Sequence, residues 1–232
     1  MQPSPPPPPP PPRPLSRLAP VLWALLFGSL VCCGMLVVRM MLGGAARFTG
    51  LAGNLLLAWI PLGLSLLLRY VDWQPGRRRR LFWLTGLLWF LFFPNCFYIV
   101  TDLIHIRKFG SDGVPKWLDM MITAGFGLTG VFLGILALYL VHLVVRERFG
   151  YRAGWAFAIV MLALGSFGIY LGRYLRWNSW EVFTRPWKLW GNAARLVDES
   201  ERVAGFWVTF FFFSLMAYLF VVAMARLHER EA

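Results

Sequence analysis

The sequence predicts an all-α integral membrane protein, a polytopic bundle of about six transmembrane helices. Hydrophobic residues make up 58% of the 232 residues, charged residues make up only 15%, and the mean hydropathy is +0.59. This composition leaves too little polar surface for a water-soluble globule of the same size. A bilayer core needs roughly 20 apolar residues per helix. The chain offers about six such runs, and they lack the alternation of polar and apolar residues that marks a transmembrane β-strand.

The predicted spans lie near residues 21–41, 51–71, 81–100, 117–145, 153–172 and 203–225. Together they form one predicted transmembrane domain over residues 20–228, with an interfacial loop at residues 173–202 before the last span. A proline tract at 5–12 precedes the first span, and such tracts favour an extended conformation that buries nothing. Residues 1–19 are therefore expected to be a disordered tail. The first apolar run lacks a clear cleavage site, so we expect it to remain as a helix.

Basic residues outnumber acidic ones by 23 to 11, which gives a formal net charge of +12. This excess sits at the ends of the spans, where the enrichment of Lys and Arg on the cytoplasmic side explains it. Nucleic acid is therefore excluded as a partner. The run Arg77–Arg80 is the strongest indicator of orientation and places the N-terminus in the cytoplasm. The three cysteines, Cys32, Cys33 and Cys96, show no metal or disulfide spacing and are expected to be packing residues.

Polar residues inside or beside the spans are costly in lipid, and they usually face the bundle interior or water. Here they gather in four segments: Asn54 opens the second span, 94–105 closes the third, Asp119 opens the fourth, and 166–181 closes the fifth. If the spans alternate in direction, the start of an even span and the end of an odd span lie on the same face. All four segments are therefore expected to meet on one side, which is extracytoplasmic if the N-terminus is inside.

Four sequence segments, NLLLAWIPL, FFPNCFYIVTDLIH, PKWLDMM and LGRYLRWNSWE, resemble the signature segments of the DUF1361 family of bacterial membrane proteins. The resemblance covers roughly residues 54–181. It implies a multi-spanning protein of the bacterial cytoplasmic membrane, and the family name itself denotes unknown function. The matching positions are Asn54, Trp59, Pro61, Pro94, Asn95, Tyr98, Asp102, His105, Asp119, Gly172, Arg173, Tyr174, Arg176, Trp177, Asn178, Ser179 and Trp180. One departure is Cys96-Phe97, where the family pattern has a small residue followed by proline.

Acid/base or metal chemistry is one hypothesis for the polar residues. Asp102 and His105 are three residues apart and would share a face of a helix, and Asp119 or Glu181 could complete a site. Asp102, His105 and Asp119 are therefore candidates for both catalytic and metal-binding roles. An Asp beside a His is, however, frequently only an interfacial hydrogen-bonded pair, so the sequence decides neither for nor against an enzyme and names no cofactor. His142, at the other end of the fourth span, is expected to be a solitary interfacial residue.

Anion binding is a second hypothesis, because Arg173 and Arg176 stand beside Trp177 and Trp180. Arginines next to a stacking surface suit a phosphate or carboxylate head group. The alternative is that these side chains are only snorkelling cations and members of an aromatic belt at the membrane interface. The candidate ligand-binding residues are Asn54, Asn95, Tyr98, Arg173, Arg176, Trp177, Asn178 and Trp180.

Two of these candidates have structural alternatives. Asn54 is better explained by hydrogen bonding between helices than by ligand binding. Asn95 follows Pro94, which disfavours helix, so the Asn95 amide is suited to capping backbone groups where the third span ends or kinks.

Two classes of function remain. The first is an envelope enzyme or a lipid-binding protein, whose partners are the bilayer and an anionic lipid head group or a small molecule of the envelope. The second is a transporter or an assembly subunit of a membrane complex, in which the same residues only hold helices together. Transport predicts polar or broken helices near mid-membrane and an internal repeat, whereas the polar residues crowd at one end. A shared site requires Asp102, His105, Asp119 and Arg173 to lie in one pocket.

Overall fold

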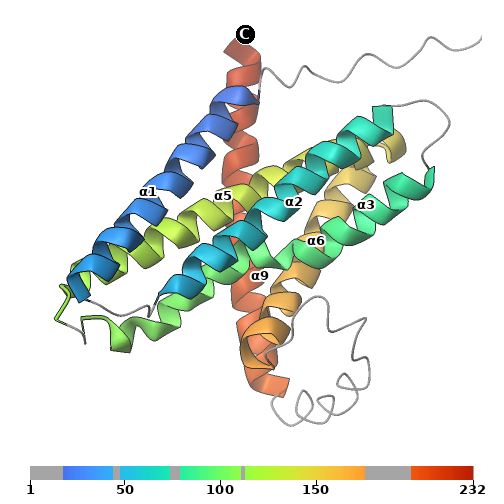
Figure 1. The fold of residues 1–232 in the computed structure, drawn as a ribbon. Coiled ribbons are helices and arrows are strands. Elements are labelled where there is room, and N and C mark those ends of the chain that lie inside the picture. Colours follow the sequence, from blue (N-terminus) through green and yellow to red (C-terminus); the bar gives the residue numbers. More distant parts are fainter. Residues whose placement is uncertain (1–17, 44–47, 74–78, 111–112, 176–199, 232) are drawn as a thin grey trace, which may run out of the picture.

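The computed structural model describes residues 18–43, 48–73, 79–110, 113–175 and 200–231, and all regular structure in these ranges is helical. The helices are α1 (Ala19–Gly43), α2 (Thr49–Trp73), α3 (Arg79–Phe92), α4 (Pro94–Tyr98), the 3₁₀ helix η2 (Ile99–Lys108), α5 (Lys116–Phe149), α6 (Tyr151–Tyr174) and α9 (Ser200–Glu231) (Figure 1). The all-α prediction is confirmed. The proline tract and most of the predicted interfacial loop lie outside the described residues.

Six stretches of the described chain are long and apolar enough to cross a membrane. They are Ala19–Gly43, Thr49–Asp72, Arg79–His105, Lys116–Phe149, Tyr151–Tyr174 and Ser200–Ala225. Each predicted span lies inside one of these stretches. The protein is an integral membrane protein.

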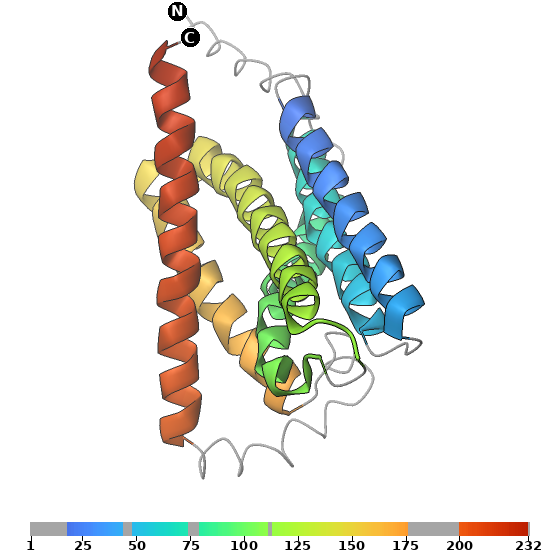
Figure 2. The same cartoon turned by 90° about the vertical axis from the view of Figure 1, so that its left-hand side faces the viewer.

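Helix α5 is the centre of the bundle. The most apolar part of α5 is 72% buried, compared with 22% for the corresponding parts of α1 and α9. α5 packs against α1, α2, α4, α6, α9 and η2, and Figure 2 shows α1 and α9 on opposite sides of it. Because the outer helices expose large apolar side chains along their length, their outward faces suit lipid as the solvent.

The third span consists of three consecutive helical pieces. α3 ends at Phe92, and α4 begins at Pro94, whose ring removes a backbone N–H and clashes with the preceding turn of an α-helix. The Nδ2 atom of Asn95 donates a hydrogen bond to the carbonyl oxygen of Phe92 at 3.0 Å. This bond satisfies a backbone acceptor at the break, so the predicted capping role of Asn95 is confirmed.

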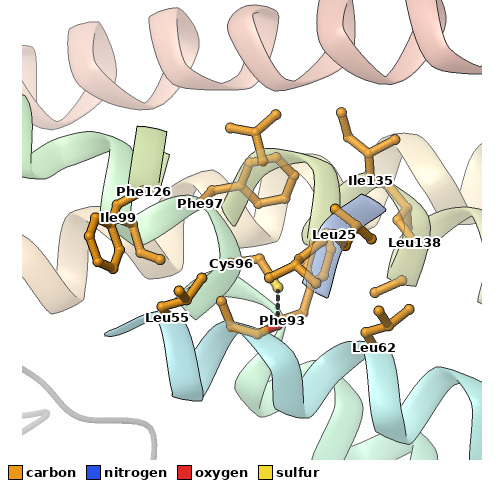
Figure 3. Packing of buried hydrophobic residues seen from close by; sticks show 14 of the residues in the cluster. Leu25, Leu55, Leu62, Phe93, Cys96, Phe97, Ile99, Phe126, Ile135 and Leu138 are labelled. Atoms are coloured by element: carbon orange, nitrogen blue, oxygen red, sulfur yellow. Dashed lines mark hydrogen bonds between the residues drawn. The ribbon is translucent and has the colours of Figure 1, made fainter. Parts of the chain in front are cut away.

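Two glycines of α5 make room for α4. A Cβ atom at Gly130 would lie 2.5 Å from the carbonyl oxygen of Cys96, and a Cβ atom at Gly134 would lie 2.8 Å from the Cβ atom of Cys96. The close approach of the two helices therefore requires glycine at both positions. On its other side, the Cys96 thiol donates to the carbonyl oxygen of Ala58 in α2 at 3.3 Å. Figure 3 shows Cys96 within the buried apolar cluster, in agreement with its predicted packing role.

The antiparallel course of the spans brings the start of α2, η2, the start of α5 and the end of α6 to one end of the bundle, here called the η2 end. Hydrogen bonds join Asn54 of α2 to Asp102 of η2, and Arg173 of α6 to the same Asp102. Asp119 of α5 accepts from the backbone of Gly110, shortly after η2. The prediction that the polar segments meet on one side is therefore confirmed for the described residues.

Candidate functional site

A charge-paired cluster at the η2 end joins α2, α4, η2 and α6; it consists of Asn54, Tyr98, Thr101, Asp102 and Arg173 and is called the Arg173 cluster. The Nη1 atom of Arg173 donates to Asp102 Oδ1 at 2.8 Å and to the Tyr98 hydroxyl oxygen at 3.3 Å. Its Nη2 atom donates to the carbonyl oxygen of Thr101 at 2.7 Å. The guanidinium also lies over the Tyr98 ring, with Cζ 5.4 Å from the ring centroid. Arg173 is thus held by three types of acceptor: a carboxylate, a hydroxyl and a carbonyl.

Local sequence explains why both charges occur where they do. Arg173 lies in the last turn of α6, where a cation is favourable beside the negative end of the helix dipole. Asp102 lies in the first turn of η2, and its second oxygen, Oδ2, accepts from Asn54 Nδ2 at 3.2 Å. The prediction that Asn54 forms a hydrogen bond between helices is confirmed. Both carboxylate oxygens of Asp102 are therefore engaged by the protein.

The guanidinium of Arg173 still carries unused donors. An arginine side chain has five N–H donors, and the hydrogen bonds of Arg173 to the described residues use three of them. Two N–H donors remain for a further acceptor. The side chains of Arg173 and Asp102 are 12% and 15% exposed, so the pair is largely desolvated without being sealed off. A fixed guanidinium with spare donors is suited to binding a phosphate or carboxylate oxygen.

A second ion pair at the same end consists of Arg39 and Asp119, with Phe48 and Gly110; these four residues are called the Arg39 cluster. Arg39 Nε donates to Asp119 Oδ1 at 3.0 Å, and both side chains are 0% exposed. The backbone N–H of Gly110 donates to Asp119 Oδ2 at 3.0 Å. The guanidinium of Arg39 also lies over the Phe48 ring, 4.8 Å from its centroid. This cluster attaches α1 to α5.

The single pocket predicted for Asp102, His105, Asp119 and Arg173 is divided in the structure. Asp102 and Arg173 lie together, whereas both oxygens of Asp119 are engaged in the Arg39 cluster. His105 lies exposed on η2. The sequence interpretation missed Arg39 as the partner of Asp119. The available signal was a basic residue inside the first apolar run, because such a residue needs a counter-charge within the bundle.

The part of the chain that the structure describes does not provide a set of ligands for a metal ion. No group of three or more His, Cys, Asp or Glu side chains there could hold a metal ion. The catalytic and metal-binding roles of Asp102, His105 and Asp119 remain predictions. The other candidate ligand-binding residues, Arg176, Trp177, Asn178 and Trp180, lie outside the described residues.

His142 is a buried residue, so the prediction of a solitary interfacial histidine is wrong. It is 4% exposed, and its Nδ1 atom lies 2.6 Å from the hydroxyl oxygen of Tyr218 in α9. Its ring meets the Trp155 ring edge-on, with the centroids 5.1 Å apart. The reason is that α6 and α9 both pack around this end of α5, which the sequence near His142 does not reveal.

Comparison with protein families places most of the chain in one known group. Residues 54–218 match the family model described as "Protein of unknown function (DUF1361)". The match covers more than two thirds of the 232 residues. It contains the whole Arg173 cluster and Asp119, and it begins after Arg39. The search of curated proteins and the search of solved structures each found no match.

Proposed function

Because the chain belongs to the DUF1361 family of proteins of unknown function, we propose a function from the geometry of its polar end. The protein is a membrane protein that binds an oxyanion, a phosphate or carboxylate group, through Arg173. The observation that carries this proposal is a guanidinium fixed by the described residues with two of its five N–H donors left over.

Preorganisation is the physical reason why such a site can bind. Immobilising a free arginine side chain on binding costs conformational entropy, and Arg173 is already immobilised by Asp102, Tyr98 and Thr101. The remaining donors make charge-assisted hydrogen bonds, which are stronger than neutral ones. The low dielectric around a largely buried pair strengthens them further.

The surrounding charge supports the same proposal and its placement. The carboxylate of Asp102 offsets the charge of Arg173, so attraction must come from neighbouring residues. Residues 174–202, which follow Arg173 in the sequence, contain five basic and four acidic residues, a balance of +1. Arg79 and Arg80, the last two residues of the basic run, open α3 at the opposite end of the bundle. With that run in the cytoplasm, the Arg173 cluster faces the extracytoplasmic side.

The test is titration of inorganic phosphate into the full-length protein in zwitterionic nanodiscs, followed by calorimetry. Wild type should bind phosphate, and Arg173→Gln should abolish binding because it removes the charge and most donors. Asp102→Asn should bind phosphate about tenfold more tightly, because the substitution removes a negative charge close to the anion. A tenfold change in affinity corresponds to roughly 1.4 kcal/mol. The matched control is Arg148→Gln, at the opposite end, which should bind phosphate as wild type does. Phosphate binding that survives Arg173→Gln would overturn the proposal.

A structural role is the second candidate, and one observation favours it. Both oxygens of Asp102 are bonded within the protein, to Arg173 and Asn54, so Asp102 alone ties η2 to α2 and α6 without any ligand. If the Arg173 cluster is purely structural, wild type should bind no phosphate and Arg173→Gln should lower only the thermal stability. The same titration, combined with a melting curve of each variant, distinguishes the two candidates.

A further inference from the structure

Four arginines surround the end of α5 that lies away from the Arg173 cluster. Two open α3, one lies in the last turn of α5 and one is the second residue of α6; they are called the arginine patch and are Arg79, Arg80, Arg146 and Arg152. The Arg148 guanidinium lies over the Phe82 ring, with Cζ 4.4 Å from the centroid, which joins the start of α3 to the end of α5. A Cβ atom at Gly154 would lie 2.9 Å from the Cβ atom of Arg146. The start of α6 therefore packs against the same end of α5.

The carboxylates at this end of the bundle are paired with other arginines. Glu147 Oε1 lies 3.6 Å from Arg69 Nη2, and Asp72 forms an ion pair with Arg148. The arginine patch forms no ion pair with any side chain in the described part of the chain. Its four positive charges are therefore not balanced by the residues that the structure describes.

Exposed aromatic side chains mark the depth of the arginine patch in the bilayer. Trp83 lies one turn after the start of α3, while Phe149 and Tyr151 flank the junction of α5 and α6, and all three are exposed. Tryptophan and tyrosine are enriched at the interface between membrane and water. Arginine side chains at this depth extend along the apolar surface toward the head groups. The anionic groups nearest to the patch are therefore the phosphates of the surrounding lipids.

We propose that the arginine patch binds an anionic phospholipid of the leaflet at that end of the bundle. This site is separate from the Arg173 cluster and does not depend on the proposed function. The planar fork of N–H donors in a guanidinium matches the oxygens of a phosphate. A zwitterionic phospholipid carries a positive amine beside the same phosphate, so four unbalanced cations favour a lipid with a net negative charge. In the proposed orientation this leaflet is cytoplasmic, the side on which anionic lipids give the membrane surface a negative potential.

Free inorganic phosphate should bind only weakly to the arginine patch. Three of its arginines are exposed and Arg146 is half-buried, so immobilising them costs conformational entropy, whereas Arg173 is already held by its neighbours. A phosphate ion in water also loses translational freedom on binding, while a lipid is already confined to the membrane. The patch therefore selects a lipid, and the phosphate titration of the Arg173 cluster does not report on it.

The experiment measures how strongly spin-labelled phosphatidylglycerol and spin-labelled phosphatidylcholine associate with the full-length protein in phosphatidylcholine nanodiscs, by electron paramagnetic resonance. Wild type should bind phosphatidylglycerol at least about fivefold more tightly, the factor that a single arginine at an anionic surface contributes. Replacing all four patch arginines by glutamine should make the two lipids associate equally. Replacing them by lysine is the matched control, which keeps the charge and should keep most of the preference. Raising the salt concentration to about 1 M should lower the wild-type preference, because the Debye length falls to about 3 Å.

The outcomes keep this proposal apart from the proposed function. Arg173→Gln should leave the lipid preference unchanged; a preference lost in that variant would assign the lipid to the Arg173 cluster and overturn the proposal. Equal association of the two lipids in wild type, a preference that survives in the glutamine variant, or an equal loss in the lysine variant would also overturn it. If the glutamine variant does not insert, Arg80→Gln combined with Arg152→Gln removes half of the patch charge and must at least halve the preference. Failure of wild type to bind inorganic phosphate would overturn the proposed function alone.

Discussion

Two Arg–Asp pairs lie at the same end of this bundle, and their surroundings differ. In the Arg39 cluster both side chains are 0% exposed, and a backbone N–H occupies the second carboxylate oxygen. In the Arg173 cluster the two side chains are 12% and 15% exposed, and the guanidinium has donors to spare. One pair fixes the peripheral helix α1 to the central α5, while the other joins α2, η2 and α6.

The comparison shows that residue types alone do not separate a structural ion pair from a binding site. A fully buried and fully bonded pair has no capacity for a ligand, so its effect is on folding. A partly exposed pair with unused donors can also interact with a third group. The family match includes both members of the Arg173–Asp102 pair but only Asp119 of the other.

The largest expected effect is on the Arg39 cluster. Asp119→Ala removes the counter-charge of Arg39 from a fully buried position, and breaking such a pair costs about 3–5 kcal/mol. The free energy of unfolding, measured by chemical unfolding in detergent, should fall by that amount. Arg39→Met combined with Asp119→Leu should recover most of the loss, because neither charge then remains buried. Wild-type stability in Asp119→Ala would contradict the structural role.

A smaller loss of stability is expected at Arg173. Arg173→Gln removes hydrogen bonds between charged groups, which are worth about 1.5–3 kcal/mol, and the remaining exposure of the pair places the loss at the lower end. The melting temperature should drop less than in Asp119→Ala, while phosphate binding is lost. Equal destabilisation by the two substitutions would show that the two pairs have the same role.

The contribution of Asn54 should be smaller still. Its hydrogen bond to Asp102 spans 3.2 Å, and hydrogen bonds between membrane helices average about 0.6 kcal/mol. A double-mutant cycle of Asn54→Ala with Asp102→Ala should give a coupling energy of that size. A coupling energy near zero would show that the Asn54 amide does not stabilise Asp102. A value above about 1.7 kcal/mol would exceed the range known for such bonds.

The smallest effect is expected at His105, which is exposed on η2. His105→Ala should change the free energy of unfolding by less than about 0.5 kcal/mol, as for most surface substitutions. The measurement is repeated with added Zn²⁺. If Zn²⁺ stabilises wild type and this stabilisation disappears in both His105→Ala and Asp102→Ala, the result would support a metal site between these two residues.

The sequence was sufficient for the fold because each span is a long, continuous apolar run, and Pro94 marked the break in the third. It also placed the polar segments on one side, since alternating spans leave no other arrangement. The pairing of charges could not be predicted. Asp119 has a partner 80 residues away, and whether it meets Arg39 or Arg173 depends on which helices pack against α5. The same limitation hid the contact of His142 with Tyr218, because apolar outer faces of helices do not specify their neighbours.

The winding of η2 has a consequence for the length of the third span. A 3₁₀ helix rises about 2.0 Å per residue and an α-helix about 1.5 Å, so rewinding the 10 residues of η2 as α-helix would shorten the span by about 5 Å. Rewinding would also rotate Asp102 by about 60° relative to Ile99, since a residue turns about 120° in one helix and 100° in the other. The carboxylate would then leave Arg173. The ion pair between Arg173 and Asp102 therefore opposes shortening of this part of the third span.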